Sequence, residues 1–299
     1  MTLVIKDGDR DSTIWNGVKP RKTDIIICSC YKSGTTLTQQ IVNLLINGSS
    51  EFKKFKSLHE LSPWVEETSK RFFSSLETKL NHIEKLPEPR FLKSHLPFEA
   101  LPYYPEWKYL YLVRDGREVA LSLYHHEKAV DSRYYELIVK PEESFVEFWE
   151  AWIETGRPAW LFLEHVQSWW QFRHLPNVLL VHYSDLIKDK LKEVERIADF
   201  LNIKIDSPKK DIILHQSSLQ YMTENWEKFQ APGLLPKSFF GNSKKVSWKQ
   251  LLPPEKSEKY EKLIIEKLGF ECANWVKNGG ALPELPKSVS GSTTRLDQN

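Results

Sequence analysis

Residues 24–36, DIIICSCYKSGTT, decide the fold class of this chain. The apolar run at 24–29 predicts a strand buried on both faces, and residues 36–47, TLTQQIVNLLIN, have the spacing of a helix. A turn between a strand and a helix directs backbone amides and the positive end of the helix dipole at one point, where anions bind. Because Lys32 precedes Gly34, this loop lacks the G-x-x-x-x-G-K-[ST] spacing of nucleoside triphosphatases. The sequence predicts a phosphate or sulfate site, and a plain turn with a helix cap is the alternative.

Strand and helix patterns alternate along the rest of the chain. Further apolar or aromatic runs predict strands at 89–94, 108–113 and 177–183. Helical spacing recurs at 116–126, 143–154, 159–173, 186–202 and 254–268. This alternation predicts a single-domain α/β fold with a central parallel sheet flanked by helices. Residues 203–245 have little periodicity, so we expect loops and short helices there, close to a site.

The domain limits follow from composition. We expect an N-terminal segment at 1–22, the folded domain at 23–278 and a flexible tail at 279–299, which is rich in Pro, Ser and Gly. The start of the chain predicts neither a signal peptide nor a membrane anchor, so a cytoplasmic location is expected. The three cysteines are too few for a disulfide framework and are interpreted as buried thiols.

The charge balance limits the partners. The chain has 42 Lys and Arg against 40 Asp and Glu, a net charge of +2, which gives no general attraction for nucleic acid. Any anion site must therefore be local. Neither nucleic acid nor a membrane is an expected partner.

Two further stretches carry charged and titratable side chains at predicted strand ends. In FLKSHLP, Lys93 and His95 are two residues apart and are expected on one face, near the ligand edge of the sheet. In YLVRDGREVALSLYHH (111–126), Arg114 can grip a phosphate through two parallel hydrogen bonds, and Ser122 can add a hydroxyl. The alternatives are a structural histidine, a surface arginine and an ordinary helical serine.

These motifs together resemble the cytosolic-type sulfotransferases, whose typical forms are YPKSGTTW, KTHLP and RNPKDVAVSYYHF. Their order and spacing agree, and EHVQSWW (164–170) and VHYSDL (181–186) extend the resemblance over about residues 22–275. It implies a P-loop-like fold and the donor 3′-phosphoadenosine-5′-phosphosulfate (PAPS), with 3′-phosphoadenosine-5′-phosphate (PAP) as product and no metal. We expect a bacterial or natural-product-like member of that family.

The resemblance also assigns roles to individual residues. It implies that His95 is the catalytic base, that Lys32 and Lys93 assist catalysis, and that Arg114 and Ser122 bind the 3′-phosphate. It implies that the loop binds the 5′-phosphosulfate and that three further positions lie near the adenine. The loop residues are Lys32, Ser33, Gly34, Thr35 and Thr36, and the positions near the adenine are Tyr183, Ser218 and Leu219.

This chain departs from the family pattern on the adenine side. Leu37 stands where the typical sequence has the Trp that stacks on adenine, and Leu219 stands where a second aromatic is usual. Aromatic stacking on a base contributes about 1–3 kcal/mol in nucleic-acid binders. We therefore expect adenine to lie between aliphatic side chains and the donor to bind more weakly than in a typical member.

A second departure concerns the 3′-phosphate. In FFGNSKKVSWK (239–249) the usual Arg-Lys-Gly has become Gly241, Asn242 and Ser243. Two interpretations stay open: Ser243, Lys244 and Lys245 still bind the donor, or the lysines form an ordinary solvated face. The oligomeric state also stays open, because no dimerisation motif is visible at 254–275.

The predicted reaction is in-line transfer of a sulfuryl group to a small acceptor, through a hydroxyl or an amine or carbamate nitrogen of a natural product, phenol or lipid alcohol. Aromatic segments around the acceptor are expected at Trp64, at Tyr103-Tyr104 and within 143–173, although several must be core. The aromatic residues of the last segment are Trp149, Trp152, Trp160, Trp169 and Trp170. A nucleotide kinase and a catalytically inactive sulfotransferase-like nucleotide-binding protein are the alternatives; no Walker spacing or metal-ligand motif supports the kinase.

Overall fold

A computed structural model describes residues 3–49, 52, 55–69, 72–130, 144–156, 161–229 and 246–284. Several sequence predictions fall outside these ranges. They include those on Trp160, on residues 230–245 with Gly241, Asn242, Ser243, Lys244 and Lys245, and on most of the expected tail at 279–299.

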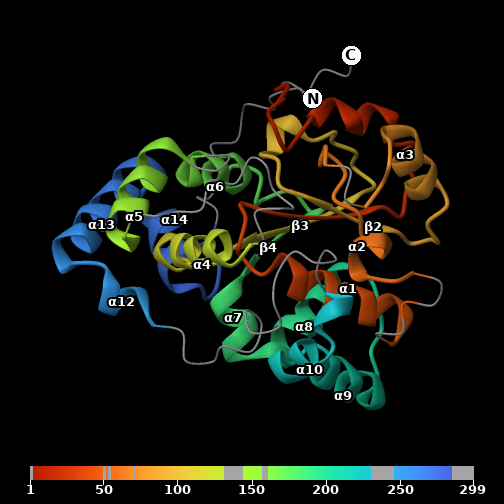
Figure 1. Ribbon diagram of the computed structural model, residues 1–299. Coiled ribbons are helices and arrows are strands. Elements are labelled where there is room, and N and C mark those ends of the chain that lie inside the picture. The colour runs from red at the N-terminus through yellow and green to blue at the C-terminus, as the bar shows by residue number, and fades with distance from the viewer. Residues whose placement is uncertain are drawn as a thin grey trace, which may run out of the picture.

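A four-stranded parallel sheet forms the centre of the molecule (Figure 1). Its strands are β1 (Ile25–Ser29), β2 (Phe91–Ser94), β3 (Lys108–Val113) and β4 (Val178–His182). They lie in the order β2-β1-β3-β4, so the first strand in sequence is central and both edges are later strands. All four correspond to the predicted strands, and the predicted α/β fold is confirmed. Because the strands are parallel, all their carboxyl ends meet at one edge, where ligands bind in open α/β sheets.

Alternate residues of each strand enter two different cores. In β1, Ile26 and Cys28 belong to one buried cluster, while Ile25 and Ile27 belong to the other. This double burial is the physical reason that the strands have continuous apolar runs rather than an alternating pattern.

Helices cover both faces of the sheet (Figure 1). The first cluster includes residues of α4 (Gly116–Ala129), α5 (Phe145–Thr155), α6 (Phe162–Trp170), α13 (Pro254–Leu268) and α14 (Phe270–Asn278). The second includes residues of α1 (Thr35–Asn47), α2 (Leu58–Leu61), α8 (Lys190–Phe200), α9 (Ser207–Gln216) and α10 (Leu219–Glu224). The remaining elements are η1 (Ser12–Gly17), α3 (Leu76–Glu84), η2 (Phe98–Ala100), α7 (Tyr183–Lys188), η4 (Trp226–Lys228) and α12 (Trp248–Leu251).

The structure corrects the prediction of one helix at 186–202. Two helices, α7 and α8, meet at Asp189, whose carboxylate caps α8 by accepting a hydrogen bond from the Lys192 amide. The predicted strand at 177–183 is shorter, because Tyr183 is the first residue of α7. This shift turns the tyrosine from the sheet toward the loop at 30–36.

All three cysteines are buried and free, as predicted. Among the described residues, no helix is both long enough and apolar enough to cross a membrane. The same part of the chain contains no group of three or more His, Cys, Asp or Glu side chains able to hold a metal ion.

Candidate active site

The loop between β1 and α1 forms the floor of the site. Gly34 has a φ of +95° and precedes α1, whose first-turn amides have no acceptor within the helix. A Cβ on Gly34 would lie 2.6 Å from Cδ2 of Tyr183, so both the backbone and the packing require glycine. Lys32 also lies in the left-handed region, with a φ of +52°. This backbone geometry suits an anion, and the anion site stays a prediction.

The hydroxyls of Ser33 and Thr35 are hydrogen-bonded within the protein. Ser33 Oγ donates to the carbonyls of Cys30 and Tyr31, at 3.1 and 3.0 Å. The hydroxyls of Thr35 and Ser29 are hydrogen-bonded to each other, with 2.6 Å between Oγ1 and Oγ. These bonds fix the loop, whose backbone amides and Lys32 have the chemistry that suits an anion.

His95 is held at three points at the carboxyl end of β2. Its backbone amide donates to Glu66 Oε1 at 2.6 Å, and its carbonyl accepts from Nε2 of His165 at 3.2 Å. Its ring Nδ1 lies 2.7 Å from the Ser29 carbonyl, which can only accept, so Nδ1 carries the proton. This tautomer leaves Nε2 as the ring nitrogen that can accept a proton.

Burial lowers the pKa of His95 well below its usual value of 6.5. Desolvation is the largest cause, and the positive charge of Lys93 acts in the same direction. His95 is therefore a neutral imidazole at pH 7, which is the form that a general base requires.

Aromatic rings surround His95. Tyr31 stacks on its ring with a centroid distance of 4.3 Å, and Trp64 contacts it edge-on at 5.0 Å. Lys93 Nζ lies 4.9 Å from the centroid of Trp64, a cation–π contact. His95 thus lies against Tyr31 of the loop, and Trp64 contacts both His95 and Lys93.

Glu66, which sequence reasoning missed, organises this region. It is fully buried, and its Oε1 accepts hydrogen bonds from the amide of His95, Nε1 of Trp64 and Oγ of Ser94, while its Oε2 accepts from Nε1 of Trp15. Residues 63–65 run beside β2, with hydrogen bonds between Lys93 and both Pro63 and Val65. Because residues 63–65 lie along β2, the carboxylate of Glu66, the next residue, reaches the amide of His95.

Arg114 lies against the phosphate loop. Its Nη1 donates to the Lys32 carbonyl at 3.5 Å, its Nε donates to Glu118 at 2.7 Å, and its guanidinium lies 4.3 Å from the ring centroid of Tyr183. Ser122 is two helical turns further along α4 and is partly exposed. Arg114 therefore stands beside the loop, with Tyr183 packed against both Arg114 and Gly34.

Three of the predicted adenine positions lie at the starts of α1 and α10. Leu37 is partly exposed in the first turn of α1, while Ser218 caps α10 and Leu219 is 63% exposed. Ser218 Oγ accepts from the Tyr221 amide at 3.1 Å, so this hydroxyl also has a structural role. An exposed Leu219 offers an apolar surface but no ring.

A second residue that sequence reasoning missed is His126 on α4. Lys32 Nζ lies 3.2 Å from its Nδ1. The available signal was its position: the histidine ends the YHH of this chain, where the typical family form YYHF has Phe.

Most of the aromatic residues expected around an acceptor belong to the core. Trp149, Trp152, Trp169 and Trp170 are at most 8% exposed. Tyr103 and Tyr104 pack on Tyr109 and Trp107, respectively. Of the predicted acceptor residues that the structure describes, Trp64 is the one in contact with His95.

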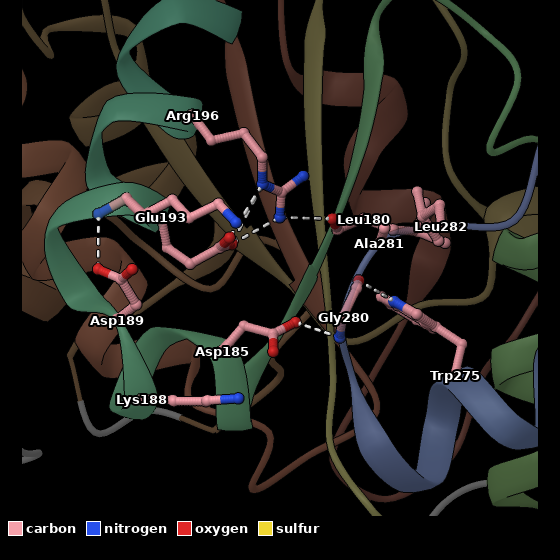
Figure 2. A pocket seen from close by; sticks show the side chains of 11 residues that line it. Leu180, Asp185, Lys188, Asp189, Glu193, Arg196, Trp275, Gly280, Ala281 and Leu282 are labelled. Carbon is pink, nitrogen blue, oxygen red and sulfur yellow. Dashed lines mark hydrogen bonds and ion pairs between the residues drawn. The ribbon is translucent and has the colours of Figure 1, made fainter.

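A surface hollow of about 490 Å³ lies elsewhere, along the β4 edge of the sheet (Figure 2). Leu180, α7, α8 and residues 280–282 line it. Arg196 donates to the Leu180 carbonyl at 3.0 Å and pairs with Glu193, so the charged groups there close the sheet edge. None of the predicted site residues lines this hollow.

Comparisons with known proteins support the family resemblance. A model of the family described as "Sulfotransferase domain" matches residues 22–270. Sulfotransferase 1B1 of Mus musculus is 31% identical over 68% of this chain and 66% of its own length, and sulfotransferase 1E1 of Homo sapiens is 31% identical over 71% of both chains. The crystal structure of retinol dehydratase with androsterone and inactive cofactor PAP has a TM-score of 0.70 at 25% identity, covering 86% of this chain and 83% of its own.

Proposed function

The chain belongs to the sulfotransferase family, and we propose that it transfers the sulfuryl group of PAPS to a hydroxyl or nitrogen of a small acceptor, with His95 as the general base. The use of PAPS follows from the family and from the PAP-bound structures of its relatives. The observation that supports the mechanism is the fixed, buried and neutral His95 beside the anion-binding loop.

The donor would be held at two anionic groups. The loop amides and Lys32 suit the 5′-phosphosulfate, because a helix N-terminus and an ammonium group favour negative charge. Arg114 and Ser122 suit the 3′-phosphate, and Tyr183 suits one face of the nucleoside. Leu37 and Leu219 would contact the adenine, which predicts weaker donor binding than stacking would give.

In the proposed step, the acceptor oxygen or nitrogen attacks sulfur in line with the bond from sulfur to the bridging oxygen. The new bond forms as that bond breaks, and the acceptor proton moves to Nε2 of His95. PAP leaves with the electron pair of the broken bond. Lys32 neutralises the charge that develops on the bridging oxygen, and Lys93 supports the sulfuryl oxygens. Trp64 and Tyr31 would line the acceptor site beside His95, and their rings favour a flat or apolar acceptor.

A cytoplasmic location is part of this proposal. The three buried, free thiols suit a reducing compartment.

Calorimetric titration with PAP tests donor recognition, with AMP and Mg²⁺–ATP as control ligands. We expect PAP to bind without metal and more tightly than AMP, because AMP lacks the 3′-phosphate. Arg114→Ala should weaken PAP binding about 10-fold to 100-fold while AMP binding stays unchanged, since a charge-assisted hydrogen bond contributes about 1.5–3 kcal/mol. Arg173→Ala, which removes an arginine packed on Trp170, is the matched control.

The outcomes separate catalysis from binding. Equal affinity for PAP and AMP would remove the 3′-phosphate site. Tight PAP binding without transfer of label from PAPS to any acceptor would favour the inactive nucleotide-binding protein over the enzyme.

A further inference from the structure

Lys32 and His126 form a direct contact between the phosphate loop and α4. The distance from Lys32 Nζ to His126 Nδ1 is 3.2 Å. An ammonium group can only donate, so His126 Nδ1 must accept and the imidazole must be neutral, with its proton on Nε2. The contact therefore defines the tautomer of His126.

The position of His126 on α4 explains why it reaches this lysine. It lies one helical turn after Ser122, and residues four apart share a face of a helix. Arg114 holds the backbone of Lys32 through its carbonyl, while His126 holds the tip of its side chain. Lys32 is thus bound at both ends.

We propose that His126 is a positioning residue for sulfuryl transfer, which holds Lys32 Nζ in the orientation that neutralises the leaving oxygen. This inference rests on the proposed function and assigns a role to a residue where the typical family sequence has Phe. A phenyl ring cannot accept the hydrogen bond in this way. His126 acts through Lys32 and takes no proton from the acceptor.

A positioned lysine matters because its side chain is long and flexible. Lysine has four rotatable side-chain bonds, and Lys32 is carried by a loop residue with a left-handed backbone. An ammonium group has three protons, so Lys32 can donate both to Nδ1 of His126 and to the donor oxygens. Fixing the ammonium before reaction lowers the cost of reorganisation in the transition state.

The test compares His126→Leu with His126→Asn. Leucine fills the space without an acceptor, whereas the asparagine Oδ1 can take the place of Nδ1. Turnover is measured with sulfur-labelled PAPS and 2-naphthol as a simple phenolic acceptor, and PAP affinity by calorimetry. We expect His126→Leu to lower kcat about 10-fold to 100-fold, because a hydrogen bond to a charged group is lost, and His126→Asn to stay within about threefold of wild type. PAP affinity should change less than kcat in both variants.

Two controls separate positioning from a structural effect. His174→Leu makes the same substitution at an exposed residue and should leave kcat unchanged. In a Lys32→Met background, His126→Leu should cause no further loss, because there is no ammonium left to position.

Nitrogen NMR of ¹⁵N-histidine-labelled protein tests the contact without any acceptor. The His126 signal, assigned by its loss in His126→Asn, should show an unprotonated Nδ1 and should change in Lys32→Met. A proton on Nδ1 would overturn the inference, and so would equal losses of kcat in the Leu and Asn variants or no loss in Leu. If the wild type is active and His126→Leu is unaffected, only this inference is wrong. If the wild type neither binds PAP nor transfers label, the proposed function is wrong.

Discussion

Glu66→Gln is the sharpest test of how the site is held together. The carboxylate of Glu66 is fully buried and accepts four hydrogen bonds, from His95, Trp64, Ser94 and Trp15. Glutamine has the same shape, and its oxygen can keep the three bonds now made by Oε1. Its NH₂ group would face the indole N–H of Trp15, so two donors would meet and neither would be satisfied.

The magnitude follows from these contacts. An orphaned buried donor costs about 1–3 kcal/mol, and each of three bonds weakens by about 1 kcal/mol when its acceptor loses the charge. The amide regains part of this sum, because a neutral group is cheaper to bury than a carboxylate. We expect the free energy of unfolding to fall by about 2–4 kcal/mol, which corresponds to a Tm lower by about 5–10 °C in a chain of this size.

Urea unfolding and thermal melting measure this change, and a double-mutant cycle with Trp15→Phe identifies its cause. Phenylalanine has no N–H, so the double variant should be more stable than the sum of the single effects by about 1–3 kcal/mol. Glu164→Gln, at an exposed site on α6, is the matched control. A loss under 0.5 kcal/mol, on the order of a surface substitution, or strict additivity in the cycle, would refute this account of Glu66.

Three other predictions concern catalysis, the donor and pH. His95→Gln should lower kcat about 10²-fold to 10⁴-fold with PAP affinity unchanged, and near-normal turnover would remove His95 as the base. Leu37→Trp should raise PAP affinity about tenfold, because it restores a stacking surface; unchanged affinity would argue against the adenine site. The pKa values of His95, His165 and His182 are all lowered from 6.5 by burial, that of His165 to about 3. Below about pH 6.5 the unfolded chain binds protons that the folded chain does not, so stability should be lost as pH falls from 7.5 to 5.5, with a slope of up to about 1.4 kcal/mol per pH unit for each histidine. Urea unfolding at each pH measures that slope, and a flat profile would contradict the prediction.

The sheet could be predicted from the sequence because a strand buried on both faces has a recognisable run of apolar residues. Each parallel strand is covered on both faces, so runs such as 25–28 and 109–113 are continuously apolar. The break between α7 and α8 is harder to predict from the sequence. Asp189 caps a helix within a stretch whose apolar spacing suits one helix, and capping depends on the backbone turning at that residue.

The site residues also differ in how well the sequence predicts them. Lys32, Gly34 and Arg114 stand at strand ends, where topology alone places them together. Glu66 and His126 could not be found in this way, because each meets its partner through a side-chain contact between distant segments. Glu66 is 29 residues from His95 and reaches it only because residues 63–65 lie along β2, and His126 is 94 residues from Lys32.

The lowered pKa of His95 bears on when it acts as a base in the proposed mechanism. Desolvation and Lys93 both disfavour the imidazolium, so this histidine holds a proton weakly while only the protein surrounds it. A donor in the adjacent loop brings several negative charges close to the ring, and opposite charge favours the protonated form. Donor binding should therefore raise the pKa of His95 toward the value at which proton transfer from the acceptor is efficient. The base would thus strengthen only when the group to be transferred is in place, and a titration of the His95 ring by NMR with and without PAP should show its pKa higher with PAP; an unchanged pKa would remove this coupling.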